Sequence, residues 1–335
     1  MGKGIAFAGN LVVDYIKYVD AYPAPQELAA ITGMERSVGG LVCNCALTLA
    51  KLDPRLPVKA IGIVGDDEAG GYVLSRFSGH ANVDASWVVR EGRTAFTDVV
   101  TDAGLGQRTF FTYKGANSLL TPDRFDFTVL DAGILHIGYI SLLDGLDAPY
   151  PGYPTAMCRV LDMARRSGML TSVDAVTEGG ARLARLLPPA LEYADYCIIN
   201  EHEAARATGI PLRGEGGGVL EGNLRAACSE LIAMGVGRWA VVHMPELSCG
   251  MERGGAFVER HSWKIPEGFM KSPVGAGDAF ACGVLYGAYN GWSLDKSLGV
   301  AGAVAAYSLS GAGGSDAIKP LAELMREMEG YQPKT

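Results

Sequence analysis

The chain has 335 residues, of which 48% are hydrophobic and 20% are charged, which is ample material for a buried core. Glycine occurs 45 times without a regular period and proline 16 times, which excludes collagen-like and low-complexity chains. The formal net charge of −8 argues against a surface for nucleic acid or for anionic membranes, and we expect neither as a partner.

Apolar runs alternate along the chain with helical patterns. The predicted strands are 5–13, 58–64, 133–139, 170–173, 196–199 and 239–243. The predicted helices are 41–52, 70–78, 155–166, 181–187, 201–208, 224–234, 279–289 and 298–309. This alternation predicts an α/β fold, doubly wound, with a mostly parallel sheet covered by helices on both faces.

Two regions break this alternation and predict a small additional β-sheet. Residues 94–101 and 108–113 flank a glycine-containing turn at 102–107 and indicate a β-hairpin, with 15–18 and 31–37 as partner strands. We therefore expect a single domain over residues 1–335, with a small β lid drawn from about 10–38 and 90–114. An insertion of this kind is favoured over two tandem domains because no linker is visible.

The cysteines and the apolar segments bear on where the protein works. The seven cysteines are odd in number and form no C-x-x-C motif, which indicates reduced core residues rather than disulfides or a zinc site. The first apolar run is too short and too lightly charged for a signal peptide, and the uncharged stretch 297–315 is rich in alanine, glycine and serine, typical of a packed helix. We expect a soluble, cytoplasmic protein.

The segment that points most directly to chemistry is Val274-Gly-Ala-Gly-Asp278, where a turn with two glycines leads into a helix of small residues. Backbone N–H groups of Gly275, Ala276 and Gly277, with the helix N-terminus behind them, suit an anion such as a phosphoryl group. A carboxylate at this position, Asp278, can accept a proton from an attacking hydroxyl. The same residues alone also fit a helix cap after a tight turn.

Other catalytic signatures are missing from the sequence. It contains neither G-x-x-x-x-G-K-[ST] nor a G-x-G-x-x-G that follows a strand, and it lacks the G-x-S-x-G nucleophile elbow. A dinucleotide-dependent oxidoreductase is therefore disfavoured, because its fingerprint would stand near the N-terminus.

Gly275-Ala-Gly-Asp278-Ala-Phe280 resembles the C-terminal signature of the ribokinase/PfkB carbohydrate kinase family. Three further segments are similar to family motifs in the family's order: Gly9-Asn-Leu-Val-Val-Asp14, Gly39-Gly40-Leu-Val-Cys-Asn44 and Asn200-Glu-His-Glu203. The resemblance covers about residues 5–314. It implies a ribokinase-like fold and an ATP-dependent kinase that phosphorylates a hydroxyl of a small sugar or sugar-like substrate, with ATP and Mg²⁺ as cofactors.

The resemblance also implies roles for individual residues. It assigns substrate binding to Asp14, Gly39, Gly40 and Asn44. It assigns nucleotide binding to Asn200 and Glu203, with Glu203 holding Mg²⁺ through water. It makes Asp278 the base, and Gly275, Ala276 and Gly277 the anion hole. The lid would close over the site, and it could also pair two chains into a homodimer.

Two departures from the family pattern leave alternatives open. Ser272-Pro273 stands where the family usually has Asp-Thr, so dependence on a monovalent cation is open. His243-Met244-Pro245 stands where a Thr-x-Gly often lines the nucleotide, so the nucleotide preference is open. The alternatives to a sugar kinase are a nucleoside kinase of the same family and a non-catalytic sugar-binding regulator.

Overall fold

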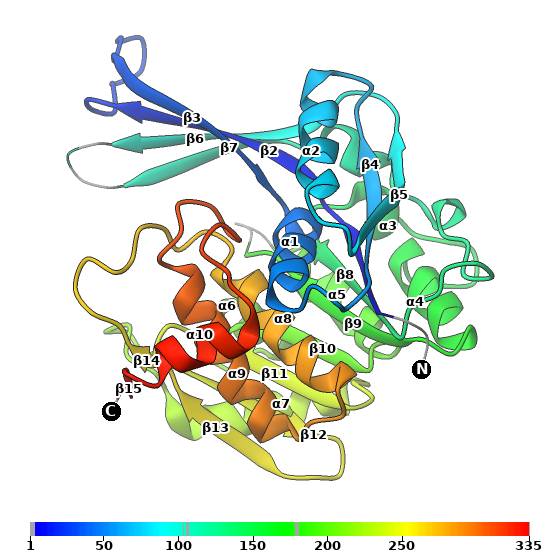
Figure 1. Cartoon of the computed structure of the whole chain (residues 1–335). Coiled ribbons are helices and arrows are strands. Elements are labelled where there is room, and N and C mark those ends of the chain that lie inside the picture. Colours follow the sequence, from blue (N-terminus) through cyan, green and yellow to red (C-terminus); the bar gives the residue numbers. More distant parts are fainter. Residues whose placement is uncertain (1–3, 103, 105–106, 178–180, 335) are drawn as a thin grey trace.

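The computed structural model describes residues 4–102, 104, 107–177 and 181–334. Its large sheet comprises Ile5–Gly9 (β1), Val58–Val64 (β4), Val83–Arg90 (β5), Ile134–Ile140 (β8), Leu170–Ala175 (β9), Tyr196–Asn200 (β10), Trp239–His243 (β11), Leu247–Glu252 (β12) and Phe257–His261 (β13). The strand order is β13-β12-β11-β10-β9-β8-β1-β4-β5, and Figure 1 shows these strands crossing the body of the molecule. All pairings from β11 to β5 are parallel, and β12 and β13 are antiparallel at one edge.

Helices cover both faces of this sheet. One face carries Leu41–Leu52 (α1), Glu68–Ser78 (α2), Ala276–Tyr289 (α8), Leu294–Ser308 (α9) and Leu321–Met328 (α10). The other carries Asp144–Asp147 (α3), Ala156–Arg166 (α4), Leu183–Leu191 (α5), Glu201–Thr208 (α6) and Glu221–Ala233 (α7). Each helical layer has its own buried apolar cluster against the sheet, which confirms the predicted doubly wound architecture.

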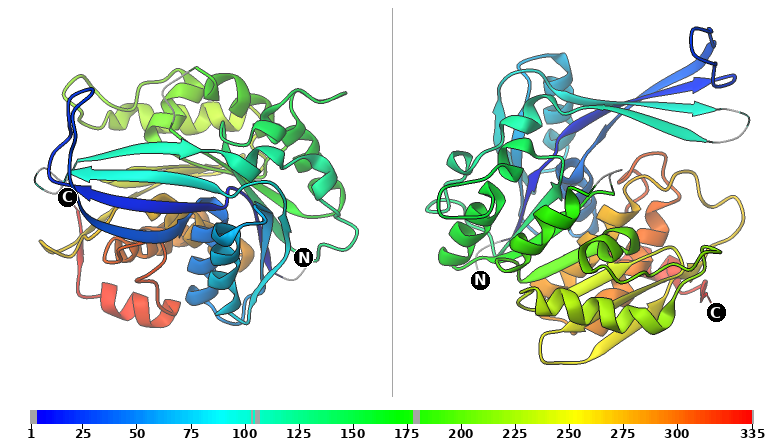
Figure 2. Two further views of the ribbon diagram at one scale, coloured as in Figure 1. Left: turned by 90° about the horizontal axis from the view of Figure 1, so that it is seen from above. Right: turned by 180° about the vertical axis from the view of Figure 1, so that it is seen from behind.

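A second, smaller sheet extends beyond this body, as Figures 1 and 2 show. It consists of Val12–Val19 (β2), Ile31–Gly39 (β3), Ala95–Asp102 (β6) and Arg108–Tyr113 (β7), in the order β3-β2-β6-β7. β2 and β6 are parallel, and the two outer pairings are antiparallel. The predicted hairpin and partner strands are present, although residues 103, 105 and 106 of the predicted turn lie outside the described residues.

The prediction of one strand over 5–13 is wrong, because the chain changes sheets within that run. β1 ends at Gly9, where φ is 134° and a Cβ would overlap the Gly138 carbonyl oxygen. At Leu11 the side chain of Asn117 replaces the strand partner, since its Oδ1 accepts from the Leu11 N–H at 3.1 Å and its Nδ2 donates to the Leu11 carbonyl at 3.2 Å. β2 then begins at Val12 in the small sheet.

Several predicted helix boundaries also differ from the structure, three of them for a local reason. α5 continues through Pro188 and Pro189, although proline usually interrupts a helix. α9 begins at Leu294 because Ser293 caps it, its Oγ accepting from the Lys296 N–H. α8 begins at Ala276, inside the glycine turn rather than after it.

The remaining described elements are short. They are the 3-10 turns Gly115–Leu119 (η1) and Pro122–Arg124 (η2), and the strands Trp263–Lys264 (β14) and Gln332–Pro333 (β15), which pair with each other. Across the ranges that the structure describes, none of the helices combines the length and the apolar character needed to cross a membrane.

Candidate active site

The carboxyl ends of the parallel strands meet at one edge of the large sheet, the usual position of a ligand site in doubly wound folds. Polar side chains mark those ends: Asn10 after β1, Tyr139 in β8, Asp174 in β9, Asn200 in β10 and His243 in β11. Asp278, in the first turn of α8, reaches the same edge, because the Tyr139 hydroxyl donates to its carboxylate.

Asp278 is a buried carboxylate, 4% exposed, with three neighbouring donors. Tyr139 Oη donates to Oδ1 at 2.8 Å and to Oδ2 at 2.7 Å, Asn44 Nδ2 donates to Oδ2 at 2.8 Å, and Cys45 Sγ lies 3.9 Å from Oδ1. Burial raises the pKa of Asp278 to about 6, while the hydrogen bonds from these three side chains lower it. A carboxyl group with this pKa is poised to accept a proton near neutral pH.

The turn that precedes Asp278 requires glycine at its start. Gly275 has a φ of 75°, and a Cβ on it would lie 2.5 Å from the Gly314 Cα. The Ala276 N–H donates to the Pro273 carbonyl at 3.3 Å, whereas the described residues accept no hydrogen bond from the N–H groups of Gly275 and Gly277. Two backbone donors at the N-terminus of α8 are therefore available to an anion.

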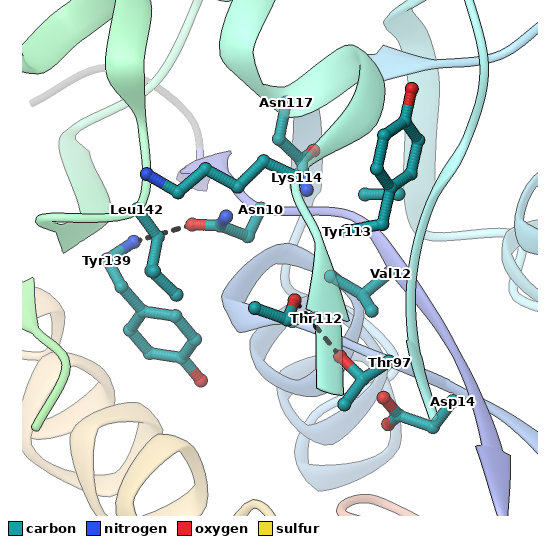
Figure 3. A pocket seen from close by; sticks show the side chains of 12 residues that line it. Asn10, Val12, Asp14, Thr97, Thr112, Tyr113, Lys114, Asn117, Tyr139 and Leu142 are labelled. Carbon is teal, nitrogen blue, oxygen red and sulfur yellow. Dashed lines mark hydrogen bonds between the residues drawn. The ribbon is translucent and has the colours of Figure 1, made fainter. Parts of the chain in front are cut away.

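A pocket opens between the small sheet and the large one (Figure 3). Its lining residues are Asn10, Val12, Asp14, Gly40, Ala95, Thr97, Thr112, Tyr113, Lys114, Asn117, Tyr139 and Leu142. Figure 3 shows the Asp14 carboxylate beside Thr97, whose hydroxyl lies 3.4 Å from that of Thr112. Burial raises the pKa of Asp14 to about 6. The pocket thus presents a carboxylate, hydroxyls and amides, which are the partners that a polyhydroxylated ligand needs.

The four residues that the sequence assigned to substrate binding occupy different positions. Asp14 and Gly40 line the pocket, and Gly40 has a φ of 80°. Gly39 lies behind Asp14, where a Cβ would overlap the carboxylate. Asn44 is not among the lining residues; its Nδ2 is bonded to Asp278, and its Oδ1 faces Gly314.

Asn200 and Glu203 form a capping box at the start of α6. Asn200 Oδ1 accepts from the Glu203 N–H at 3.0 Å, and Glu203 Oε2 accepts from the Asn200 N–H at 3.0 Å. Thr177 Oγ1 also donates to Glu203 Oε1 at 2.9 Å. Burial raises the pKa of Glu203 to about 7 despite these hydrogen bonds.

A second buried carboxylate, Asp174, lies near Glu203. Burial, together with the charges of Glu203 and Asp278, raises the pKa of Asp174 well above its usual value. Two buried carboxylates that repel each other gain from a nearby divalent cation, so Glu203 fits the role of holding a hydrated magnesium ion.

The small sheet touches the segment before the glycine turn. Arg108 Nη1 in β7 donates to Ser272 Oγ at 3.4 Å, and Ser272 is 3% exposed. The same Oγ accepts from the Val274 N–H at 3.3 Å. Lys114, just after β7, pairs with Asp144 at 2.6 Å at the pocket rim. The hairpin side of the small sheet is therefore tied at two places: to the segment before the glycine turn through Arg108, and to α3 through Lys114.

Several residues of the site were not predicted from the sequence, among them Asn10, Thr97, Thr112, Tyr139, Asp174 and His243. Asn10, Tyr139, Asp174 and His243 end or follow strands, and a polar residue at the carboxyl end of a predicted parallel strand is a signal that could have found them. Thr97 and Thr112 carry no such signal, since threonine is common in any strand.

The fold is ribokinase-like. The structure of Arabidopsis thaliana ribokinase complexed with ribose and ATP matches it with a TM-score of 0.80 and 19% identity, covering 98% of this chain and 99% of that one. A model described as pfkB family carbohydrate kinase matches residues 3–320, and the chain belongs to that family.

Two curated relatives are similar in sequence. A ribokinase from Staphylococcus aureus is 25% identical over 219 residues, which cover 64% of this chain and 66% of that protein, just under two thirds of its length. A nucleoside kinase from Methanocaldococcus jannaschii is 23% identical over 316 residues, which cover 92% of this chain and 91% of that protein.

Proposed function

We propose that the protein transfers the γ-phosphoryl group of ATP to a hydroxyl of a small sugar or sugar-like substrate. The observation that carries this proposal is the position of Asp278, a buried carboxylate that lies directly after the Gly275–Gly277 turn at the N-terminus of α8. Membership in the pfkB family of carbohydrate kinases supports the same reaction class.

The acceptor would bind in the pocket beside the small sheet. An ionised Asp14 can accept two hydroxyl hydrogen bonds, and the hydroxyls of Thr97 and Thr112 can both donate and accept. Gly40 has no side chain, so a sugar ring can approach the backbone there.

In the proposed reaction the acceptor hydroxyl gives its proton to Asp278 while its oxygen bonds to the γ-phosphorus. The bond between that phosphorus and the β-phosphate oxygen breaks, and ADP leaves. The N–H groups of Gly275 and Gly277 would stabilise the charge on the transferring oxygens, with Ala276 holding the turn through Pro273. Bound magnesium neutralises phosphate charge, and Glu203, oriented by Asn200, would hold it through water.

An assay of ADP release with Mg-ATP, run over a panel of sugars, sugar acids and nucleosides, tests the proposal. Release that depends on an added sugar supports it. A preference for nucleosides would favour the second candidate, a nucleoside kinase, which the similarity to the M. jannaschii enzyme over 92% of this chain makes worth testing. Sugar binding without any ADP release would instead indicate a regulator.

We also propose that the small sheet closes over the site as a lid and pairs two chains into a homodimer. It carries several exposed apolar side chains, namely Ile31, Met34, Phe110, Phe111 and Tyr113. Sedimentation of the wild type and of Phe111→Glu tests the pairing, because a dimer built on this sheet should be weakened by a charge at a 61% exposed position.

All seven cysteines are free and buried, which supports work in a reducing compartment such as the cytoplasm.

A further inference from the structure

The hydroxyl of Tyr139 lies on the carboxylate of Asp278, 2.8 Å from Oδ1 and 2.7 Å from Oδ2. The Tyr139 side chain also lines the pocket that contains Asp14, whereas Asp278 is not among the residues that line it. In Figure 3 the Tyr139 ring extends away from the Asn10 amide, with its hydroxyl at the far end. The phenol therefore stands between the acceptor pocket and the carboxylate proposed as the base.

The backbone of Tyr139 is anchored on both sides. Its N–H donates to Asn10 Oδ1 at 2.9 Å, and its carbonyl accepts from the Leu142 N–H at 3.1 Å. Asn10 is itself 3% exposed and follows β1, which pairs with β8. The position of the Tyr139 hydroxyl relative to Asp278 is thus fixed by two adjacent strands of the large sheet rather than by a loop.

We propose that Tyr139 is a positioning residue for Asp278, whose hydroxyl orients the carboxylate and keeps it in its proton-accepting form until an acceptor hydroxyl takes over one of its oxygens. This inference rests on the proposed role of Asp278 as the base. A phenol donates a single proton, so its contact, shared between two oxygens, can release one of them without being lost. The arriving hydroxyl then meets an oxygen that is already ionised and oriented.

The surroundings of Asp278 explain why one donor matters. Among the described residues, the other polar and titratable groups near it are Cys43, Asn44 and Cys45 in α1, Asp174 in β9, Glu203 in α6 beyond Asp174, Cys282 in α8, and His243 in β11 beside Gly277. Burial disfavours the negative charge on Asp278, and the hydrogen bonds from the neutral side chains of Tyr139, Asn44 and Cys45 favour it.

The direction of the effect follows from the hydrogen bond. Burial raises the pKa of Asp278 to about 6, and the bond from Tyr139 is one of those that lower it. Burial and the charge of Asp278 raise the pKa of Tyr139 well above its usual value, so the phenol stays protonated and donates. Removing the hydroxyl should therefore move the pKa of Asp278 upward.

The test is the pH profile of kcat/KM for the acceptor in Tyr139→Phe, which keeps the ring and removes the hydroxyl. We expect the acid limb to move up by about 0.5 to 1 pH unit, as the loss of one hydrogen bond of about 1 kcal/mol implies. Tyr286→Phe is the matched control, because Tyr286 lies in α8, the helix that carries Asp278, and donates to a different aspartate, Asp53, at 3.0 Å. An acid limb that moves equally in both variants, or in neither, overturns the inference.

A second variant avoids any loss of packing. Incorporation of 3-fluorotyrosine at Tyr139 preserves the shape and makes the hydroxyl a stronger donor, so the acid limb should move down; an unmoved limb again overturns the inference. Asp278→Asn distinguishes a failure of the proposed function from a failure of the proposed role of Tyr139. Near-normal turnover there refutes the proposed function, whereas an inactive Asp278→Asn with unmoved limbs in the Tyr139 variants removes only the role of Tyr139.

Discussion

Asn44 donates a hydrogen bond to Asp278 across 2.8 Å, although 234 positions separate the two residues. Asn44 lies in the first turn of α1, directly after Gly39 and Gly40, and Asp278 lies in the first turn of α8, directly after the second glycine turn. Two helices that begin at the same edge of the sheet therefore join their N-terminal turns through one amide and one carboxylate. The contact links the two glycine turns, and with them the proposed acceptor side and the proposed phosphoryl side of the site.

Asp278→Asn should abolish most of the turnover. The amide keeps the shape of the side chain but cannot accept the proton of the acceptor hydroxyl, so kcat should fall by about 10² to 10⁴, the usual contribution of a general base. Steady-state ADP release measures the loss, and circular dichroism checks that the fold is retained. A variant with near-normal kcat would contradict the assignment.

Gly275→Ala should lower both stability and activity. Gly254→Ala is the control that separates the strain of a positive φ from the close approach to Gly314. Both glycines have a positive φ, 75° and 70°, so both substitutions carry the strain of a left-handed conformation, about 1 to 2 kcal/mol. Only at Gly275 does the added Cβ meet backbone, at 2.5 Å from the Gly314 Cα, while at Gly254 it meets nothing within 4 Å. We expect Gly275→Ala to lower the Tm more than Gly254→Ala does, and we expect only Gly275→Ala to lose turnover. Equal behaviour of the two variants would mean that the close approach to Gly314 is unimportant.

The large sheet and the glycine turn were predictable because both depend on local chemistry. Alternating apolar runs specify strands and helices, and a Gly-x-Gly before a helix of small residues specifies a tight turn with exposed N–H groups. The break after Gly9 was not predictable, since an apolar run fits one strand or two equally well. The side chain of Asn117, which bonds to the Leu11 backbone at the break, lies more than a hundred residues away in the sequence.

The hydrogen-bond partners of the site residues could not be predicted from the sequence either. Tyr139 ends an ordinary apolar strand, and its contact with Asp278 depends on the spatial order of the strands rather than on any motif. The same holds for Asn44, whose amide could equally have turned toward a sugar or toward a carboxylate.

Asp14→Asn should stabilise the protein in a pH-dependent way while it weakens acceptor binding. Burial raises the pKa of Asp14 from 3.8 to about 6, so the folded state binds this proton more tightly than the unfolded state does. The wild type therefore loses stability as the pH rises from about 4 to 6, and the uncharged asparagine does not. The Tm of the variant minus that of the wild type should be larger at pH 7.5 than at pH 4.5, by about 1 to 3 °C.

The same variant should raise the KM of the acceptor about tenfold or more, because an ionised hydrogen-bond partner is lost. Thermal unfolding at the two pH values and steady-state kinetics provide the measurements. A Tm difference that does not change with pH would count against the raised pKa of the Asp14 carboxyl group.

Arg108→Ala should weaken the contact of the small sheet with the segment before the glycine turn. The bond from Arg108 to Ser272 is long, at 3.4 Å, so we expect kcat/KM to fall only about fivefold, with relatively more ATP hydrolysed in the absence of the acceptor. Arg36→Ala is the control, since Arg36 lies in the same sheet but pairs with Glu68. The ratio of ATP hydrolysis to phosphoryl transfer measures the effect, and a ratio that changes equally in both variants would show that the Ser272 contact is not its cause.

The crossing of the chain between the two sheets has a mechanical consequence. Asn10, one of the two residues that join β1 to β2, also forms part of the pocket wall and holds the backbone of Tyr139. Any rotation of the small sheet must bend the chain at this joint. A ligand that fills the pocket would therefore contact the joint directly, so the proposed closure of the small sheet needs no separate sensing element.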